Sequence, residues 1–343
     1  MKNLVFFLLV VVLILGSTVA GLAEAQPFYD GKTIRIIVPY GAGGGFDTYA
    51  RMIQPYLEKY LSGSKVIVDN VTGAGGAVGR NMAFIAKPDG CTLCLTAGPD
   101  MVFNTIAESE GVKYKIDKWT YLARITVESS VLTVPAESQF ETFEEIVNAN
   151  KRLLFPVAGV GDADFFALGV AAHVFDFEIM PVTGYAGSKE ASMAIVRGEV
   201  DLFQVSLGTA LPLIRNGDIK GIVVYSLERL PELPEVPTLV EIANDNNFGL
   251  TEEDKKIIRA IINVDEVRRL IIAPPGLDES KTSILREAVK KALHDPELIA
   301  HSKQMNRPII YLEGEKIAQL ISETMEVKEL IKPILEETLK LAQ

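Results

Sequence analysis

The fold is indicated most directly by residues 34–47, which read Ile34-Arg35-Ile36-Ile37-Val38 and then Pro39-Tyr40-Gly41-Ala42-Gly43-Gly44-Gly45-Phe46-Asp47. The apolar run is typical of a buried strand, and a helical pattern follows over residues 46–61. The first N–H groups of a helix are unpaired and carry partial positive charge, and glycine lets a ligand approach them closely. This first glycine turn therefore predicts a site for a carboxylate or phosphate.

A second glycine turn follows the next strand-like run, Val66-Ile67-Val68. It reads Asp69-Asn70-Val71-Thr72-Gly73-Ala74-Gly75-Gly76-Ala77-Val78-Gly79 and precedes a helical pattern over 76–87. In a parallel sheet, the turns that follow neighbouring strands lie at the same edge. We therefore expect both glycine turns to face one cleft, supplying N–H donors to an anion without a nearby Lys or Arg.

Length and charge restrict the class of protein. The chain has 343 residues, which favours two domains, and its 48% hydrophobic and 23% charged residues are typical of a globular protein. A net charge of −11 makes nucleic acid an improbable partner, because such binding depends on Lys and Arg neutralising phosphates. We expect a monomer that binds no nucleic acid.

Residues 1–25 have the pattern of an export signal. Lys2 precedes an apolar run from Leu4 to Leu15, and Ala23-Glu24-Ala25 is a small-x-small cleavage site. The apolar run is shorter than the ~20 residues of a membrane span, although extension through Leu22 leaves an uncleaved anchor as an alternative. The pattern predicts a mature, exported chain that begins at Gln26.

The two cysteines, Cys91 and Cys94, lie in a strand-like segment. Three residues along a strand span ~10 Å, which exceeds the ~7 Å Cα separation that a disulfide allows. Two cysteines also cannot complete a structural zinc site, and the three histidines have no ligand spacing. The sequence predicts free thiols, no metal and no cofactor.

Strand-like and helical patterns alternate along the chain, which predicts an α/β fold with mainly parallel sheets. Two segments lack this alternation, one from Arg124 to Pro135 and one from Leu227 to Pro237, and both are interpreted as hinge crossings. The division expected is a first lobe of residues 26–126 and 228–343 and an inserted second lobe of residues 127–227. The strand-to-helix corner Val157-Ala158-Gly159-Val160-Gly161-Asp162 then faces the glycine turns across the cleft.

Enzyme motifs fit poorly. The dinucleotide pattern G-x-G-x-x-G/A fails at Phe46 in the first turn and at Val78 in the second, although Asp69 resembles a ribose-binding acid. A Walker loop fails because Gln26 stands at the leading glycine position, and no nucleophile elbow occurs. An exported α/β enzyme acting on a nucleotide or acyl substrate stays open as an alternative.

Several motifs together resemble the periplasmic solute-binding component of tripartite tricarboxylate transporters, colinearly over most of residues 30–310. They are Ile36-Ile37-Val38-Pro39, Gly43-Gly44-Gly45-Phe46-Asp47-Thr48, Ala50-Arg51, Gly73-Ala74-Gly75-Gly76 with Gly79, Pro88-Asp89-Gly90-Cys91-Thr92-Leu93, Gly184-Tyr185-Ala186-Gly187-Ser188, Gly198-Glu199-Val200-Asp201-Leu202 and Val236-Pro237-Thr238-Leu239-Val240-Glu241. The resemblance implies a type II periplasmic-binding-protein fold with two hinge crossings and no catalysis.

The resemblance also implies that a small organic acid is captured between the lobes in the periplasm and delivered to membrane permease subunits. A sensory binding protein that presents its ligand to a receptor is the second alternative. Carried over by position, the implied ligand-binding residues are Tyr40, Gly41, Ala42, Gly43, Gly44, Gly45, Phe46, Asp47, Thr48, Ala74, Gly75, Gly76, Ala77, Val78, Val157, Gly161, Asp162, Tyr185, Gly187, Ser188, Val205 and Ser206.

The sequence departs from the family pattern at four positions. The family usually has a small hydroxyl residue where this chain has Phe46, serines near Val157 and Asp162, and an aspartate near Val205. Asp162 would repel a second ligand carboxylate, unless it is protonated or paired, or it is simply the N-cap of a helix over 164–175. Asp47 is similarly placed to cap a helix over 48–61. We expect a monocarboxylate with an apolar or aromatic body, or a zwitterion whose amine meets Asp162, in preference to citrate.

Overall fold

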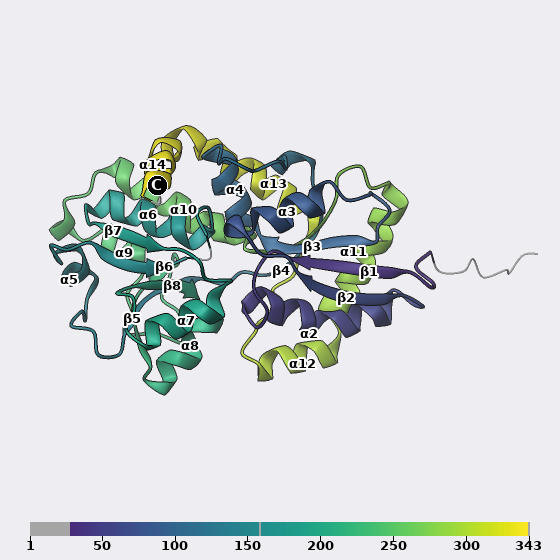
Figure 1. Cartoon of the computed structure of the whole chain (residues 1–343), viewed down its shortest axis with the longest axis horizontal. Coiled ribbons are helices and arrows are strands. Elements are labelled where there is room, and N and C mark those ends of the chain that lie inside the picture. Colours follow the sequence, from purple (N-terminus) through teal and green to yellow (C-terminus); the bar gives the residue numbers. More distant parts are fainter. Residues whose placement is uncertain (1–27, 158, 342–343) are drawn as a thin grey trace, which may run out of the picture.

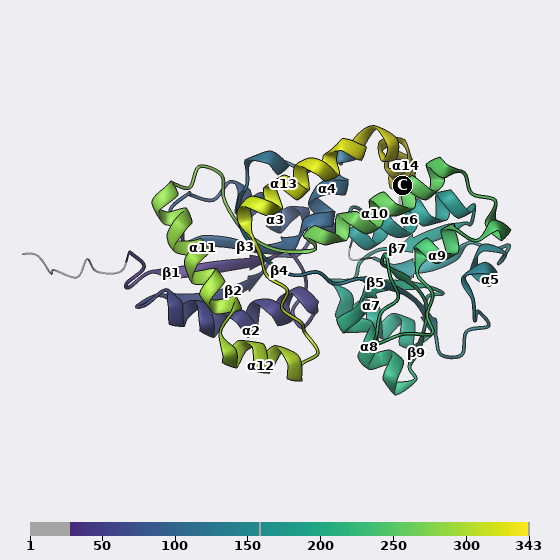
Figure 2. The same cartoon turned by 180° about the vertical axis from the view of Figure 1, so that it is seen from behind.

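The structure is a computed structural model that describes residues 28–157 and 159–341. The expected export signal and its cleavage at Gln26 lie outside the described residues. Two groups of elements lie side by side, each built around its own sheet (Figures 1 and 2). We call them the first lobe, around the six-stranded sheet, and the second lobe, around the three- and two-stranded sheets.

The six-stranded sheet of the first lobe has the order β11-β4-β10-β3-β1-β2. Its strands are β1 (Thr33–Val38), β2 (Lys65–Asn70), β3 (Thr92–Ala97), β4 (Thr120–Thr126), β10 (Arg269–Ala273) and β11 (Leu312–Glu313). The strands β2 and β3 pair in parallel with β1, whereas β10 is antiparallel to β3 and β4. The strands β1 to β4 thus run in one direction, and β10 and β11 oppose them.

Helices cover both faces of this sheet (Figures 1 and 2). They are α2 (Gly45–Tyr60), α3 (Ala77–Phe84), α4 (Gly98–Ile106), α11 (Glu279–Leu293), α12 (Pro296–Gln304) and α13 (Gly314–Thr324). The buried positions of α2 include Tyr49, Ile53 and Leu57, which are spaced three or four residues apart and therefore form one face. That face joins Ile34 and Ile36 of β1 in one apolar cluster.

The second lobe has a three-stranded sheet of order β8-β5-β9 and a parallel pair, β6 with β7. Its strands are β5 (Ser130–Pro135), β6 (Leu153–Pro156), β7 (Ile179–Val182), β8 (Phe203–Ser206) and β9 (Ile219–Tyr225). Its helices are α5 (Phe143–Val147), α6 (Ala163–Phe175), α7 (Ser188–Val196), α8 (Leu207–Asn216), α9 (Leu239–Ala243), α10 (Glu252–Asn263) and α14 (Lys328–Lys340). The helix α6 is apolar nearly all round and buried, as expected of a central helix.

The two-lobed α/β fold is as the sequence predicted, and the sheets are mixed. Alternation of strands and helices predicted mainly parallel pairing, yet β5 is antiparallel to both β8 and β9, and β10 is antiparallel to its neighbours. Both strands follow a crossing between the lobes. The strand β4 runs into β5 of the other lobe without an intervening helix, so the strand–helix alternation from which parallel pairing was predicted is interrupted there.

The packing does not follow the expected division at residues 227 and 228. The helix α9 contacts β9, and α10 contacts α9 and α6 of the second lobe. The helix α14 also packs against α6, after α13 has packed on β4 (Figure 2). The apolar face of α10, with Ile257, Ile258 and Ile261, is buried in the α6-centred cluster, so the proline-rich segment before α9 is a surface loop within the second lobe.

Both cysteines are free, as the strand argument predicted. Cys94 is fully buried in β3, and burial raises the pKa of its thiol to about 12. Over residues 28–157 and 159–341, no cluster of three or more His, Cys, Asp or Glu side chains is arranged to hold a metal ion. Within the same ranges, no helix has the length and hydropathy needed to span a bilayer.

Candidate ligand-binding site

A cavity of about 80 Å³ lies between the two lobes. This is room for a ligand of few heavy atoms, since one water needs about 10–15 Å³. Both lobes and the start of β10 contribute to its wall. The lining residues are Tyr40, Gly44, Gly45, Phe46, Ala97, Asp100, Pro156, Asp162, Ala163, Asp164, Gly187, Ser188, Ala191, Phe203, Gln204, Val205, Ser206, Arg268 and Arg269.

The first glycine turn lines the cavity through the N-terminus of α2. Gly44 is the N-cap residue, and no side chain caps this helix end. The N–H groups of the first turn have no intrahelical partner, so they are available to a ligand. The cavity wall contains Gly44, which lies next to Ser188 at the start of α7, and Gly45, which lies next to Arg269.

Asp47 is not the N-cap, because α2 begins at Gly45. Its carboxylate instead accepts a hydrogen bond from the Gly43 N–H at 2.7 Å and pairs with Arg51 on the next helical turn. Burial alone would raise the pKa of Asp47, but the bonds from Arg51 and Gly43 hold it below its usual value. The Asp47 carboxylate thus stays charged and fixes the shape of the turn.

One side of the cavity is aromatic. The rings of Tyr40 and Phe46 lie 4.3 Å apart between centroids, and the Arg269 guanidinium lies 4.4 Å from the Phe46 centroid. Phe46 therefore makes this end more apolar, and it also packs against a cation.

The second glycine turn does not line the cavity, which differs from the expectation that both turns face the ligand. It lies against the backbone of the second lobe instead. A Cβ on Gly75 would come 2.8 Å from the Asp162 nitrogen, and one on Gly159 would come 2.4 Å from the Gly75 nitrogen. The turn is thus a contact between the lobes, and Ala74, Gly76, Ala77 and Val78 belong to it.

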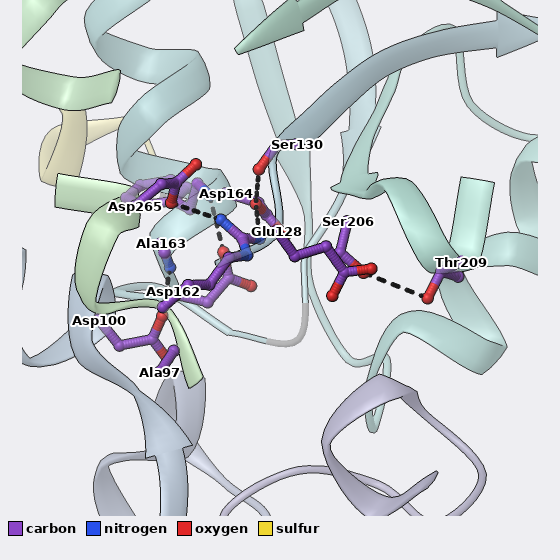
Figure 3. Close-up of polar contacts among 12 residues, drawn as sticks. Ala97, Asp100, Glu128, Ser130, Asp162, Ala163, Asp164, Ser206, Thr209 and Asp265 are labelled. Atoms are coloured by element: carbon purple, nitrogen blue, oxygen red, sulfur yellow. Dashed lines mark hydrogen bonds and ion pairs between the residues drawn. The ribbon is translucent and has the colours of Figure 1, made fainter. Parts of the chain in front are cut away.

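Arg80 and Asp100 were not predicted from the sequence; Asp100 joins the two lobes, and Arg80 holds Asp100 from within the first lobe. Arg80 is fully buried, and its guanidinium donates to Asp100 at 2.8 Å and to the Gly75 carbonyl at 2.5 Å. Asp100 also accepts from the Ala163 N–H of α6 at 2.8 Å and from the Tyr40 hydroxyl. Figure 3 shows Asp100 pointing at Ala163. The segment around Gly98-Pro99 carries no strong helical signal, so α4 and its acid were not predicted.

Two aspartates at the start of α6 form the second-lobe wall of the cavity. Asp162 is the N-cap, and its side chain accepts from the Phe165 N–H at 2.7 Å, so the predicted cap is confirmed. Asp164 accepts from Ser130 at 3.3 Å and from Arg268 at 3.1 Å (Figure 3). Both aspartates line the cavity, and Asp162 is therefore a cap and a wall residue at once.

The expectation that no Lys or Arg lies near the anion site was wrong, because Arg268 and Arg269 both line the cavity. Arg269 contacts Glu128 with Nε at 2.9 Å and Nη2 at 2.5 Å. Arg268 pairs with Asp265 at 2.6 Å and with Asp164. A basic pair at the head of a buried strand, Arg268-Arg269 before Leu270-Ile271-Ile272, was the signal available in the sequence.

Burial and the neighbouring arginines have opposing effects on the pKa values of the acids in this network. Burial raises the pKa of Asp164, against the opposing effect of Arg268, and raises that of Asp265 to about 6. Burial acts on Glu128 in the same direction, but Arg269 and Arg307 outweigh it and hold the pKa of Glu128 below its usual value. Glu128 thus remains the anionic partner that orients Arg269.

Three buried side chains in the wall have polar atoms without a partner among the described residues. They are Gln204, with both amide atoms unpaired, Arg268, with Nε unpaired, and Arg269, with Nη1 unpaired. Gln204 is 3% exposed and Arg269 1% exposed. A buried polar group without a hydrogen bond costs about 1–3 kcal/mol, so these atoms are suited to bind a ligand.

The remaining predicted residues divide between the wall and its surroundings. Gly187, Ser188, Val205 and Ser206 line the cavity, and α7 begins at Ser188 with no side-chain cap. The others lie outside the wall. Val157 is buried in the core, the Gly161 carbonyl accepts from Asn104, and Thr48 bonds to the Gly44 carbonyl. Tyr185 packs against the apolar cluster that contains Ala191 and Ala194 of α7, and Gly41, Ala42 and Gly43 do not line the cavity.

Known proteins resemble this chain in both sequence and structure. Residues 49–337 match the family described as "Tripartite tricarboxylate transporter family receptor". A UPF0065 protein of Pseudomonas sp. from the tcbD-tcbE intergenic region is 28% identical over 90% of this chain and 88% of its own length. A UPF0065 protein of Bordetella pertussis is 27% identical over 82% of each chain.

Two solved structures have the same fold. The periplasmic binding protein BugD aligns with a TM-score of 0.75 and 21% identity, covering 89% of this chain and 98% of its own. MatC from Rhodopseudomonas palustris, solved with bound malate, aligns with a TM-score of 0.74 and 23% identity, covering 89% and 99%. The family match spans most of the chain, so the protein belongs to the tripartite tricarboxylate transporter receptors, a family of solute-binding proteins rather than enzymes.

Proposed function

We propose that the protein is a periplasmic solute-binding protein that captures a small carboxylic acid between its lobes and delivers it to the permease subunits of a tripartite transporter. The observation that carries the proposal is the meeting of two uncapped helix N-termini, of α2 and α7, with Arg269 at one cavity between the lobes. Helix N-termini and guanidinium groups both favour a carboxylate.

The relatives support the ligand class. MatC was solved with malate, and a second R. palustris protein of the same fold, with a TM-score of 0.70, was solved with adipate. Both ligands are small carboxylic acids. We infer that the carboxylate of this protein's ligand lies against Gly44, Gly45, Ser188, Gln204 and Arg269, with Tyr40 and Phe46 as the apolar side.

Closure of two lobes is the proposed mode of capture, with the segment Val127–Ser129 and the segment leading into β10 as the hinges. On this division the second lobe runs from β5 to α10 and includes α14. The two lobes of a monomer would close on the ligand, and the permease would bind the closed form. Sensing is the second candidate for the same binding step, with a receptor in the place of the permease.

A ligand screen tests the binding proposal. Purified ligand-free protein is heated with mono-, di- and tricarboxylates and with amino acids, and the hits are measured by calorimetry. A ligand that binds only the native state raises the unfolding midpoint. Binding of at least one small carboxylate is expected, and a screen in which no carboxylate binds contradicts the proposal.

Export and delivery are tested in cells. Intact mass of the exported protein is expected to correspond to a chain that begins at Gln26, whereas an uncut Met1 in the membrane fraction supports the anchored form. Loss of ligand uptake on deletion of this gene or of its permease supports transport. Intact uptake with a lost transcriptional response supports sensing.

A further inference from the structure

The charged groups around the cavity are nearly balanced before any ligand enters. Each guanidinium in the wall already has an acidic partner: Arg269 pairs with Glu128, and Arg268 pairs with Asp164 and Asp265. Asp100 is likewise paired with Arg80. A ligand that brings two or three negative charges would therefore meet no unpaired cation, and its second carboxylate would be costly to bury.

The two ends of the cavity differ in what they offer. At one end lie hydrogen-bond donors, namely Arg269 Nη1, the Gln204 amide and the N-terminus of α2. A Cβ on Gly45 would come 3.0 Å from the Arg269 guanidinium, and one on Gly44 would come 3.2 Å from Ser188 Oγ. Arg269 also donates to Ser206 Oγ at 3.2 Å, and Gln204 lies two residues before Ser206 in β8, so these donors share one part of the wall, which suits one carboxylate.

At the other end lie carboxylates. Asp162 and Asp164 flank Ala163 at the start of α6, and the Asp164 side chain is 31% exposed, although it pairs with Arg268. The donors of this helix end are already used, because Ala163 N–H bonds to Asp100 and Phe165 N–H bonds to Asp162. Arg268 is shared between Asp164 and Asp265, so two carboxylates face one guanidinium at this end of the cavity. This end accepts a cation better than a second anion.

We propose that the ligand is a small aminocarboxylic acid, whose carboxylate binds at the Arg269–Gln204 end and whose ammonium binds at Asp162 and Asp164. The proposal rests on the proposed function, because it names the class of solute for the same cavity. The unpartnered, buried amide of Gln204 is the independent sign that a ligand belongs there.

The experiment compares probes that differ in one group. L-alanine, β-alanine and L-serine carry an amine, propionate and lactate are their amine-free counterparts, and malonate, succinate and malate carry a second carboxylate. Calorimetry on the full mature chain is expected to give at least one amine-bearing probe a tenfold or greater preference over its amine-free and dicarboxylate matches. Equal or tighter binding of the amine-free acids or dicarboxylates overturns the inference while leaving the proposed function intact.

Neutral substitutions of Asp162 and Asp164 then test whether the ammonium of the ligand binds at these two residues. Asp164→Asn keeps the shape of the side chain, and Asp162→Asn keeps a residue that caps helices well. Each variant is expected to lose at least tenfold in affinity for the amine-bearing probe and to lose little for its amine-free match. Glu253→Gln, an exposed acid on α10, is the control. An unchanged preference in both folded variants overturns the inference, and failure of all carboxylates to bind the unmodified protein overturns the proposed function as well.

Discussion

At the scale of single residues, the site depends on polar atoms that the protein itself does not satisfy. Gln204 is buried in β8 and bonds to no described group through its amide, although buried amides in folded proteins are nearly always paired. Arg269 Nη1 likewise bonds to no described group, whereas Nε and Nη2 of the same side chain donate to Glu128. Under the proposed function, these atoms bond to the ligand, which offsets the stability cost of leaving them unpaired.

Replacing Gln204 tests this directly. Gln204→Leu removes an amide that makes no hydrogen bond in the ligand-free protein, so the unfolding midpoint is expected to stay the same or rise. Ligand affinity is expected to fall by about 1–3 kcal/mol, because the bonds are made only to the ligand. Thermal melting and calorimetry measure the two effects. Gln139→Leu, at an exposed position, is the control, and a variant that melts lower yet binds normally would assign the amide a structural role.

At the scale of elements, Asp295 ties α12 to α2. It is the N-cap of α12 and is 2% exposed, and its carboxylate accepts from Lys59 at 2.7 Å and from the Tyr60 hydroxyl at 2.8 Å. The hydrogen bond from Lys59 is the largest of the effects that lower the pKa of Asp295 to about 2. The charged form is thus favoured in the folded state.

The sign of the resulting pH dependence follows from that pKa. The unfolded pKa of an aspartate is about 3.9, so the stabilisation is fully present above that pH and is lost as the pH falls towards 2. Asp295→Asn keeps a capping side chain and removes the charge. We expect the variant to be less stable than the unmodified protein at pH 7, with the difference disappearing between about pH 4 and 2. Denaturant titrations at each pH measure the difference in free energy of unfolding between the two proteins, and Glu235→Gln, at an exposed position, is the control. A difference independent of pH would contradict the charge argument.

At the scale of the whole molecule, the described structure is a closed arrangement in which the lobes touch around the cavity. Gly41 N–H donates to the Ala186 carbonyl at 2.8 Å, and the Asn104 amide donates to the Gly161 carbonyl. Gly75 lies against Asp162, where a side chain would collide with the backbone. Glycine at this position therefore serves the closure of the two lobes.

Gly75→Ala separates closure from ligand contact. The residue has a φ of +56° and its new Cβ would come 2.8 Å from the Asp162 nitrogen, so the closed form is expected to be disfavoured. Affinity should fall although no ligand-lining residue has changed, and small-angle scattering with ligand should report a larger radius of gyration. Gly198→Ala is the matched control, since it has a φ of +69° and no atom within 4 Å. Equal loss in both variants would mean that backbone strain alone is responsible.

Much of the local structure was predictable from the sequence. The apolar run over 34–38 lies in β1, and the helical patterns over 46–61 and 164–175 coincide with α2 and α6 to within one residue. The cap at Asp162 and the uncapped turn before α2 were also predictable, because a helix end is determined by the few residues next to it. Asp47 was misassigned because helix ends read from a pattern are uncertain by a residue or two.

The sequence by itself thus determined the elements, the family pattern and the first glycine turn. Only the tertiary structure decided the chemistry of the site. Arg269 and Glu128 lie 141 positions apart in the chain, and Asp100 and Ala163 lie 63 apart. Apolar periodicity and turn residues act over a few neighbouring positions, whereas a buried ion pair forms between groups that only the folded chain brings within bonding distance.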